Sequence, residues 1–375
     1  MLSDYKTLSA AERAALSLRE VYERYGYRKY RMGQFEEYSL YMDNKNFLSS
    51  ERVISFTDLD GRLLALRPDV TLSIVRHASE QPRAAERLYY TESVYRPSAE
   101  NNAFKEISQI GIEYIGTVDR YAMTEVTLLA AESLRAFGPR ALLELSDVRF
   151  AVGLLDALGL EDGLRSRALD ALAQKNRPAL EAVAREAKLA AGDGAALCAL
   201  IELYGPWQPT LARARQICRG AEMTAALDEL GAVCGAVASR CGGELSVDFS
   251  LVNHTAYYNG LLMRGYLEGL PRAVLVGGRY DGILKKLGKA GGGIGFGLDL
   301  SEIAQLPGDS GETPLDLLVR YTEDADPAAV AASVADAADS GLRVRALRQG
   351  EDPGDCSWKE TVLVTGAGIE RGGEG

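Results

Sequence analysis

The sequence predicts an α+β fold in which helices flank an antiparallel sheet, with a helical insertion and a small C-terminal α/β domain. Extended runs in the first part of the chain are joined by short connections. Such connections favour antiparallel pairs, because parallel strands need long crossovers. Farther along, an Ala-, Leu- and Arg-rich stretch has helical periodicity without a convincing strand, and a β-α-β pattern closes the chain.

Composition limits the class of protein. The 375 residues predict two or three domains at about 100–200 residues each. Hydrophobic residues make up 47% and charged residues 25%, which are ordinary globular values, and no apolar run approaches the ~18 residues of a membrane span. The polar N-terminus does not resemble a secretory signal, and five scattered Cys without a CxxC pair fit a reduced cytoplasmic protein.

Charge and histidine content argue against further function classes. The net charge is −11, whereas a protein whose main role is nucleic-acid binding normally carries a basic field. Only His77 and His254 are present, so a histidine-based metal site has almost no ligands available. We therefore expect no nucleic acid, no membrane, no metal and no cofactor, and a cytoplasmic location.

The first part of the core, residues 1–146, is expected to begin with a helix over Ser9–Tyr25. Gly26 ends this helix, because Gly adopts the left-handed conformation of a C-cap. Asp60-Gly61 is typical of a hairpin turn. The strands expected around and after this turn are 52–57, 62–66, 87–96 and 104–115.

The insertion covers residues 147–240, the second part of the core 241–306, and the C-terminal domain 314–375. The second core part is predicted to contain strands at 244–252, 256–266 and 273–276, then a glycine-dense region at 288–297 that enters a helix. A linker is expected at 307–313. The C-terminal domain is predicted to contain strands at 315–321, 343–347 and 361–364, a helix capped by Asp326 with Pro327 in its first turn, and a frayed Gly-rich tail.

Gln109, Gly111 and Glu113 alternate along the predicted strand 104–115. Period two places them on one face, and the Gly leaves open space above the sheet. A carboxylate and an amide in that space suit an ammonium group. The alternative is a solvated sheet face, and the spacing alone leaves both interpretations open.

Two other pairs of side chains are candidates for the same site. Asp69 and Thr71 share a face after the hairpin, and Asp69 is either a second acid for the cation or a helix N-cap. Tyr257 and Tyr258 supply rings with hydroxyl tips, which either wall a pocket for a polar heterocycle or pack as ordinary strand residues. The glycine clusters 277–282 and 291–297 match neither G-x-G-x-x-G nor a P-loop, so they predict no nucleotide fold.

Together, these segments resemble the histidyl-tRNA synthetase family, which has a class II synthetase fold. The matching segments, in the family's order, are 64–71 (LALRPDVT, similar to ALRPEGT), 95–113 (class II motif 2), 253–260 (NHTAYYNG, similar to RGLDYYTG), 277–281 (GGRYD) and 293–300 (motif 3). The resemblance implies a class II synthetase-like antiparallel sheet. It assigns free histidine to Asp69, Thr71, Gln109, Glu113, Tyr257 and Tyr258, with Arg96 as a possible anion- or phosphate-binding residue.

The departures from the family pattern remove arginines that the reaction needs. Asn253 stands in place of the histidine-activating Arg, Leu300 in place of the motif 3 Arg, and Ala103 and Lys105 thin the motif 2 pattern. Adenylation builds negative charge at the α-phosphate, and losing one stabilising donor raises such a barrier by roughly 3 kcal/mol. We therefore expect an amino-acid pocket without catalytic residues.

The C-terminal domain points the same way. Residues 314–375 hold 12 Asp and Glu against 6 Lys and Arg, whereas an anticodon-reading domain approaches phosphates and is expected to be basic. The pattern is similar to that of the regulatory subunits of ATP phosphoribosyltransferase, the synthetase paralogues of histidine biosynthesis.

The resemblance implies a non-catalytic subunit that activates a short-form catalytic subunit and mediates feedback inhibition by free histidine. It also implies a homodimer within a hetero-oligomer. Three alternatives stay open: an active histidyl-tRNA synthetase, a synthetase-like enzyme with another acyl acceptor, and an orphan histidine-binding module. Histidine could also act at a subunit interface rather than in this pocket.

Overall fold

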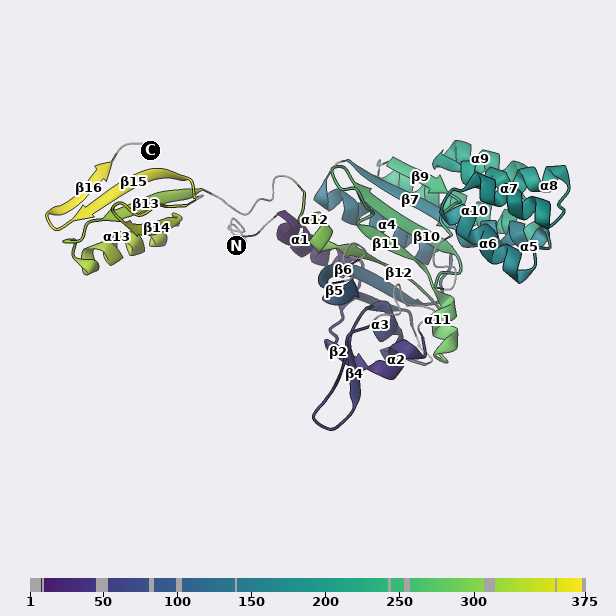
Figure 1. Ribbon diagram of the computed structural model, residues 1–375, viewed down its shortest axis with the longest axis horizontal. Helices are drawn as coiled ribbons and strands as arrows, with labels where there is room; N and C mark the ends of the chain where they lie inside the picture. Colours follow the sequence, from purple (N-terminus) through teal and green to yellow (C-terminus); the bar gives the residue numbers. More distant parts are fainter. Residues whose placement is uncertain are drawn as a thin grey trace. The chain divides into compact units, whose positions relative to one another are not determined.

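The computed structural model describes residues 8, 10–44, 53–80, 84–98, 103–138, 140–241, 244–252, 257–306, 314–354 and 356–372. The chain forms two compact units, Met1–Leu306 and Pro307–Gly375. Figure 1 shows the elements of each unit. The predicted linker 307–313 and residue Asn253 lie outside the described residues.

A nine-stranded sheet forms the centre of the first unit (Figure 1). Its strands, in sheet order, are β1 (Arg28–Lys29), β5 (Glu86–Pro97), β6 (Phe104–Gly116), β12 (Gly292–Asp299), β11 (Leu275–Arg279), β10 (Leu261–Leu267), β7 (Ala141–Asp147), β9 (Glu244–Asp248) and β8 (Tyr204–Pro206). The pairs β1–β5 and β7–β9 are parallel, and the other neighbouring pairs are antiparallel. The predicted α+β fold with a mainly antiparallel sheet is confirmed.

Helices α1 (Ala10–Arg24) and α4 (Arg120–Phe137) cover one face of this sheet. The hydroxyls of Tyr22 in α1 and Ser133 in α4 share a hydrogen bond of 2.7 Å in the core. A Cβ placed on Gly265 of β10 would lie 2.6 Å from Leu134 of α4, so this helix lies directly on the strand. The predicted N-terminal helix and its end at Gly26, where φ is +81°, are confirmed.

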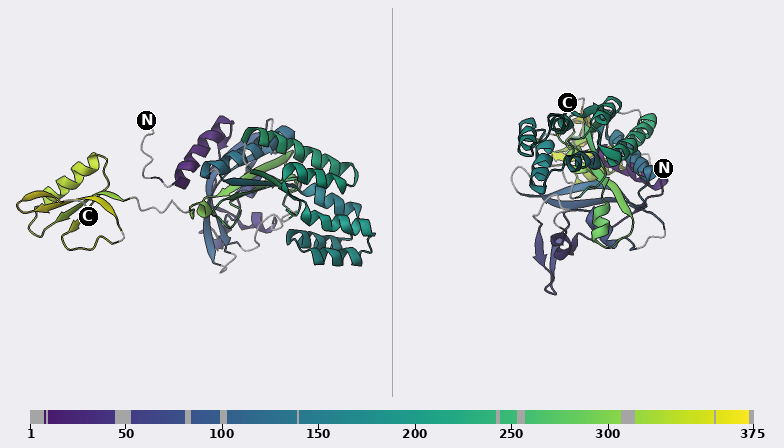
Figure 2. Two further views of the ribbon diagram at one scale, coloured as in Figure 1. Left: turned by 90° about the horizontal axis from the view of Figure 1, so that it is seen from above. Right: turned by 90° about the vertical axis from the view of Figure 1, so that its right-hand side faces the viewer.

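Between residues 148 and 241 the chain is mainly helical. The helices are α5 (Val148–Ala157), α6 (Asp162–Ala173), α7 (Arg177–Glu186), α8 (Ala191–Ala199), α9 (Trp207–Gln216) and α10 (Gly220–Cys241). They gather at the β8–β9 end of the sheet (Figure 2). The expectation of no strand in this stretch was wrong, because β8 adds a short edge strand beside β9. Gly205 and Pro206 in β8 are residues that usually break strands, so the sequence pattern does not indicate it.

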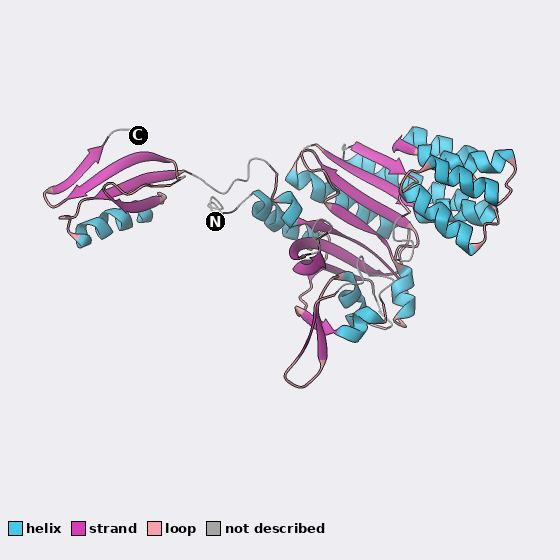
Figure 3. Ribbon diagram, viewed as in Figure 1, coloured by secondary structure: helices cyan, strands magenta, loops and turns pink. Residues whose placement is uncertain are grey.

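A small three-stranded sheet, in the order β2 (Phe35–Glu37), β4 (Leu63–Leu66) and β3 (Ser55–Thr57), contains the predicted hairpin. The hairpin extends away from the body of the unit (Figure 3). Asp58 stabilises its turn, since one carboxylate oxygen accepts the amides of Asp60 and Arg62. Gly61 has φ of +81°, as the turn requires. Helices α2 (Tyr38–Met42) and α3 (Thr71–His77) flank this region.

The second unit contains a four-stranded sheet in the order β14 (Val344–Arg348), β13 (Leu315–Tyr321), β15 (Trp358–Thr365) and β16 (Gly368–Gly372), with one helix, α13 (Pro327–Asp339). The β-α-β prediction is confirmed, and Asp326 caps the helix by accepting the amide of Ala328. The Gly-rich tail differs from its prediction, because β16 pairs with β15 instead of fraying.

Two predictions for the second core part were wrong. The glycine-dense region is the strand β12 and not a helix entry, and its glycines admit large neighbours: a Cβ on Gly293 would lie 2.2 Å from the Tyr280 ring. Tyr257 and Tyr258 lie in the turn before β10 rather than inside a strand. Within the described ranges, no helix combines the length and the apolar character that crossing a bilayer demands.

Candidate amino-acid-binding site

A cavity of about 280 Å³ lies on the sheet face opposite α4. Strands β5, β6, β11 and β12 contribute to its walls, together with the start of α3 and the turn before β10. Gly297 lines the cavity, but the open space that the sequence predicts above its partner in register, Gly111, is not found: a Cβ on Gly111 would lie 2.5 Å from the Tyr90 hydroxyl, so the Tyr90 ring fills that space. The lining residues are Asp69, Val70, Thr71, Tyr90, Arg96, Gln109, Tyr257, Tyr258, Ala273, Val274, Val276, Gly297 and Asp299.

The structure therefore brings five of the six predicted histidine-binding residues, and Arg96, to one cavity. The exception is Glu113, which does not line it. Sequence reasoning missed Tyr90, Val276 and Asp299, which lie on neighbouring strands. Their positions follow from sheet register, and the sequence alone gives no signal for that register.

Asp69 accepts a hydrogen bond at the start of α3, one of the two roles considered for it, while its role as an acid for a ligand cation stays a prediction. One of its carboxylate oxygens accepts the amide of Leu72 at 2.8 Å in the first turn of α3. The other lies 3.6 Å from a guanidinium nitrogen of Arg96, which also donates through Nε to the carbonyl of Pro68 at 2.6 Å. Burial raises the pKa of Asp69, and the charge of Arg96 opposes that rise. The cavity thus holds a carboxylate, Asp69, beside an arginine whose guanidinium already contacts this carboxylate and a backbone carbonyl.

Glu113 lies behind the cavity wall and is only 1% exposed. The hydroxyl of Thr71 donates to one of its oxygens at 2.5 Å, and the hydroxyl of Tyr280 donates to the other at 2.5 Å. Burial raises the pKa of Glu113 to about 8, although the two hydroxyl donors oppose the rise. Glu113 and Gln109 share a sheet face, as predicted. The hydrogen bond to Glu113 holds the Thr71 hydroxyl in position at the cavity wall.

Tyrosine rings form one side of the cavity. The ring centroids of Tyr257 and Tyr258 are 4.6 Å apart, and Tyr257 meets Tyr280 edge-on at 6.1 Å. A Cβ on Gly278 would lie 2.8 Å from the Tyr258 ring, so that ring rests directly on β11. Rings held in this way can enclose a flat polar heterocycle.

The positions where the family resemblance expects arginines look different. Leu300 begins the short helix α12 (Leu300–Ile303) and packs against the hydrophobic core. Lys105 lies exposed near the start of β6, next to Phe104. Asp299, directly before Leu300, accepts the amide of Glu302 and lines the cavity. This side of the site, around Lys105, Asp299 and Leu300, offers few fixed donors for a phosphate. We call it the phosphate side, and we call the side of Asp69, Gln109 and the tyrosines the amino-acid side.

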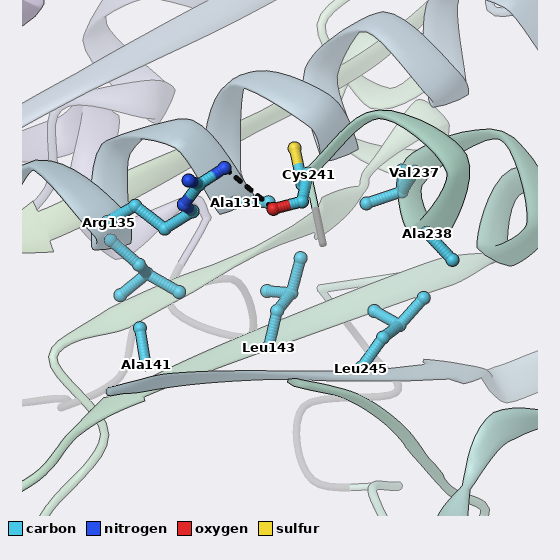
Figure 4. Close-up of a pocket in the computed structure, with 9 residues that line it drawn as sticks. Ala131, Arg135, Ala141, Leu143, Val237, Ala238, Cys241 and Leu245 are labelled. Carbon is cyan, nitrogen blue, oxygen red and sulfur yellow. Dashed lines mark hydrogen bonds between the residues drawn. The ribbon is translucent and has the colours of Figure 1, made fainter. Parts of the chain in front are cut away.

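One other hollow in the described chain is too small for an amino acid. A void of about 20 Å³ lies between α4, α10 and β7, where Arg135 donates to the carbonyl of Cys241 at 2.6 Å (Figure 4). Such a volume holds no more than about one water molecule. Among the described residues, no group of three or more His, Cys, Asp or Glu is arranged to hold a metal ion.

Residues 4–303 match the family model described as histidyl-tRNA synthetase. The ATP phosphoribosyltransferase regulatory subunit of Anaeromyxobacter dehalogenans (strain 2CP-1 / ATCC BAA-258) is 34% identical over 295 residues, which cover 77% of this chain and 84% of that protein. The protein of the same name from Clostridium kluyveri is 30% identical, over 76% of this chain and 75% of its own length.

Solved structures share the fold. A protein from Bacillus halodurans C described as an ATP phosphoribosyltransferase regulatory subunit/histidyl-tRNA synthetase has a TM-score of 0.76 at 22% identity and covers 96% of both chains. A chain of the ATP phosphoribosyl transferase (HisG:HisZ) complex from Thermotoga maritima has a TM-score of 0.62 at 18% identity, over 77% of this chain and 97% of that one. With these matches in sequence and in fold, the chain belongs to the histidyl-tRNA synthetase family, among its ATP phosphoribosyltransferase regulatory subunits.

Proposed function

We propose that this chain is the non-catalytic regulatory subunit of ATP phosphoribosyltransferase in the first step of histidine biosynthesis. It activates the short-form catalytic subunit and mediates feedback inhibition by histidine. One observation carries this proposal: the cavity keeps Asp69, Gln109 and the tyrosine wall, while, among the described residues at family arginine positions, Leu300 and Lys105 do not line it and Arg96 alone remains. The names of the relatives from Anaeromyxobacter and Clostridium support it.

Free histidine occupies the cavity in this proposal. Asp69 pairs with the α-ammonium, Gln109 orients it, and Tyr257 and Tyr258 enclose the imidazole. Glu113 acts from behind the wall, because it accepts hydrogen bonds from Thr71, which lines the cavity, and from the buried Tyr280, and so fixes both hydroxyls. An analogue without the ammonium group would leave the Asp69 carboxylate without its ligand partner. We therefore expect such analogues to bind much more weakly than histidine.

The chain does not adenylate histidine in this proposal. Asn253 and Leu300 replace arginines of the family pattern, and Lys105 is exposed rather than aimed at the cavity. Arg96 remains, but it already contacts the Pro68 carbonyl and Asp69. A site without several preorganised cations gives little stabilisation to the charge that develops on a phosphate.

The partner in this proposal is the short-form catalytic subunit of ATP phosphoribosyltransferase, and the chain acts as a homodimer within the hetero-oligomer. The fold shared with a chain of the Thermotoga maritima complex supports such a partner. The acidic C-terminal residues, 12 Asp and Glu against 6 Lys and Arg in 314–375, argue against a tRNA partner.

Mixing the two purified subunits tests the proposal. We expect light scattering to report a species larger than either subunit, a higher rate of phosphoribosyl transfer than the catalytic subunit gives alone, and inhibition by added histidine. An unchanged mass and rate would contradict the proposal. Aminoacylation of tRNA by this chain alone would favour the alternative of an active synthetase.

A further inference from the structure

One row of residues crosses the cavity face of the sheet and continues toward the helical insertion. In register, Gly297 of β12 pairs with Val276 of β11, Val276 pairs with Arg264 of β10, and Arg264 pairs with Glu144 of β7. Val276 lines the cavity and is 44% exposed. Arg264 is therefore the next residue beyond the cavity wall.

The side chain of Arg264 projects on the cavity side of the sheet. Side chains alternate along a strand, and the neighbouring Gly265 faces Leu134 of α4 on the opposite side. Adjacent strands lie about 4.8 Å apart, so a guanidinium on β10 is long enough to extend over Val276 to the cavity. Burial raises the pKa of Tyr258 in the cavity wall, and the positive charge of Arg264 is one of the smaller effects that oppose this rise.

Arg264 is partly buried and, within the described chain, forms no ion pair. Several other partly or fully buried arginines of this unit do: Arg67 binds Glu92 at 2.7 Å, Arg149 binds Asp147 at 2.5 Å, and Arg279 binds Asp281 at 2.8 Å. This difference is notable in a chain with 53 acidic and 42 basic residues.

The groups around Arg264 occupy its guanidinium only in part. Glu144 and Tyr266 face it: Arg264 donates a hydrogen bond to the Tyr266 hydroxyl, which lies 3.5 Å from Glu144, and its charge acts on the Glu144 carboxylate. Burial and the neighbouring Asp248 raise the pKa of Glu144, while the charges of Lys175 and Arg264 oppose the rise; Lys175 itself pairs with Asp248 at 2.7 Å. The neighbours of the guanidinium are thus a hydroxyl and a partly buried carboxylate, and no ion pair in the described chain fixes it.

We propose that Arg264 binds the carboxylate of the amino acid in the cavity and so determines its specificity for a complete α-amino acid. This inference rests on the proposed histidine site. A zwitterion needs an acid for its ammonium group and a cation for its carboxylate; Asp69 provides the acid from the cavity wall, and Arg264 provides the cation from just beyond Val276. Arg96 is less available, because the Pro68 carbonyl and Asp69 already occupy it. The planar guanidinium can hold both carboxylate oxygens at once.

Calorimetric titration with histidine and with histamine, which lacks the carboxylate, tests the proposal. We expect Arg264→Met to weaken histidine binding about 10- to 100-fold while leaving histamine binding unchanged. Arg264→Lys should retain part of the histidine affinity, since it keeps the charge and loses the bidentate geometry. Arg140→Met is the matched control: Arg140 is on the surface, 75% exposed, and its loss should change neither affinity.

The outcomes separate this inference from the proposed function. Suppose that wild type binds histidine, and that Arg264→Met weakens the binding of histidine and histamine equally or changes neither. The histidine carboxylate then does not contact Arg264, and only this inference fails. Selective loss of histidine in Arg96→Met, with none in Arg264→Met, would move the carboxylate to Arg96. If wild type does not bind histidine at all, both the histidine site and this inference are overturned.

Discussion

The two sides of the candidate site differ in how deeply they are built into the fold. On the amino-acid side, Thr71 and Tyr280 donate to a buried Glu113, and the Tyr258 ring rests on the strand at Gly278. On the phosphate side, the residues at family arginine positions include an exposed Lys105 and a Leu300 packed into the core. Substituting a surface donor leaves packing intact, whereas substituting a buried polar network leaves unpaired groups. A fold can therefore lose a reaction and keep a pocket.

The largest effect that we expect concerns the phosphate side. If two arginine donors are missing, each worth about 10²-fold or more, adenylation should be slower than in a working synthetase by about 10⁴-fold or more. Histidine-dependent exchange of pyrophosphate into ATP should therefore remain at background, with an active histidyl-tRNA synthetase as the positive control. Exchange at a normal synthetase rate would show that the two sides do not differ in function.

The next effect concerns the packing of the amino-acid side. A Cβ on Gly295 would lie 1.9 Å from a Glu113 oxygen and 2.4 Å from the backbone oxygen of Ile112, which cannot move aside. We expect Gly295→Ala to destabilise the fold by about 2 kcal/mol or more in thermal unfolding, and to abolish histidine binding.

Gly282→Ala is the matched control, because a Cβ on Gly282 meets nothing within 4 Å. Its helical position should make that substitution neutral or slightly stabilising. Equal stability of the two variants would mean that the amino-acid side is no more rigidly packed than the surface.

The same contrast explains what the sequence could predict. Period two placed Gln109 and Glu113 on one face, and the hairpin and terminal helices followed from glycine and capping signals, so these elements are as expected. The glycines of β12 were misinterpreted because Gly usually weakens strands. Here Gly293 and Gly295 make room for Tyr280 and Glu113, a reason that is visible only when the neighbours are in place.

The site was predicted in part for a related reason. The family motifs bring Asp69, Thr71, Gln109 and the tyrosines to one cavity. The position of Glu113 behind the wall, and the approach of Arg264 from β10, depend on which strands are neighbours. That order places β12 and β11 between β6 and β10, although both follow β10 in the sequence. Local patterns carry no information about such an arrangement.

A smaller effect tests the acid on the amino-acid side. Asp69→Asn keeps the size of the side chain and removes the charge that we assign to the ammonium. Charged hydrogen bonds contribute about 1.5–3 kcal/mol, so histidine affinity should fall about 10- to 100-fold in calorimetry. Asp60→Asn in the exposed hairpin turn is the control and should bind as wild type does. Unchanged affinity in Asp69→Asn would place histidine elsewhere, such as a subunit interface.

The smallest effect is a pH dependence that originates in Glu113. Burial raises the pKa of Glu113 in the folded chain to about 8, above the ordinary value of 4.5 that the unfolded chain retains. The folded chain therefore keeps a proton that the unfolded chain releases, and this contribution to stability is complete below about pH 4.5. It is lost as the pH rises toward 8, by at most about 1.4 kcal/mol per pH unit.

Urea unfolding of wild type and Glu113→Gln at pH 6 and pH 7 would measure this contribution. Gln cannot release a proton, so the free energy of unfolding of the variant should not fall between these pH values for this reason. The difference in unfolding free energy between variant and wild type should therefore shift in favour of the variant by up to about 1.4 kcal/mol from pH 6 to pH 7. Glu268→Gln, at a position that is 61% exposed, provides the baseline for losing a surface charge. Parallel pH profiles for wild type and Glu113→Gln would mean that Glu113 is already ionised in the folded chain. The two hydroxyl donors would then outweigh burial, and the amino-acid side would hold a permanent negative charge behind its wall.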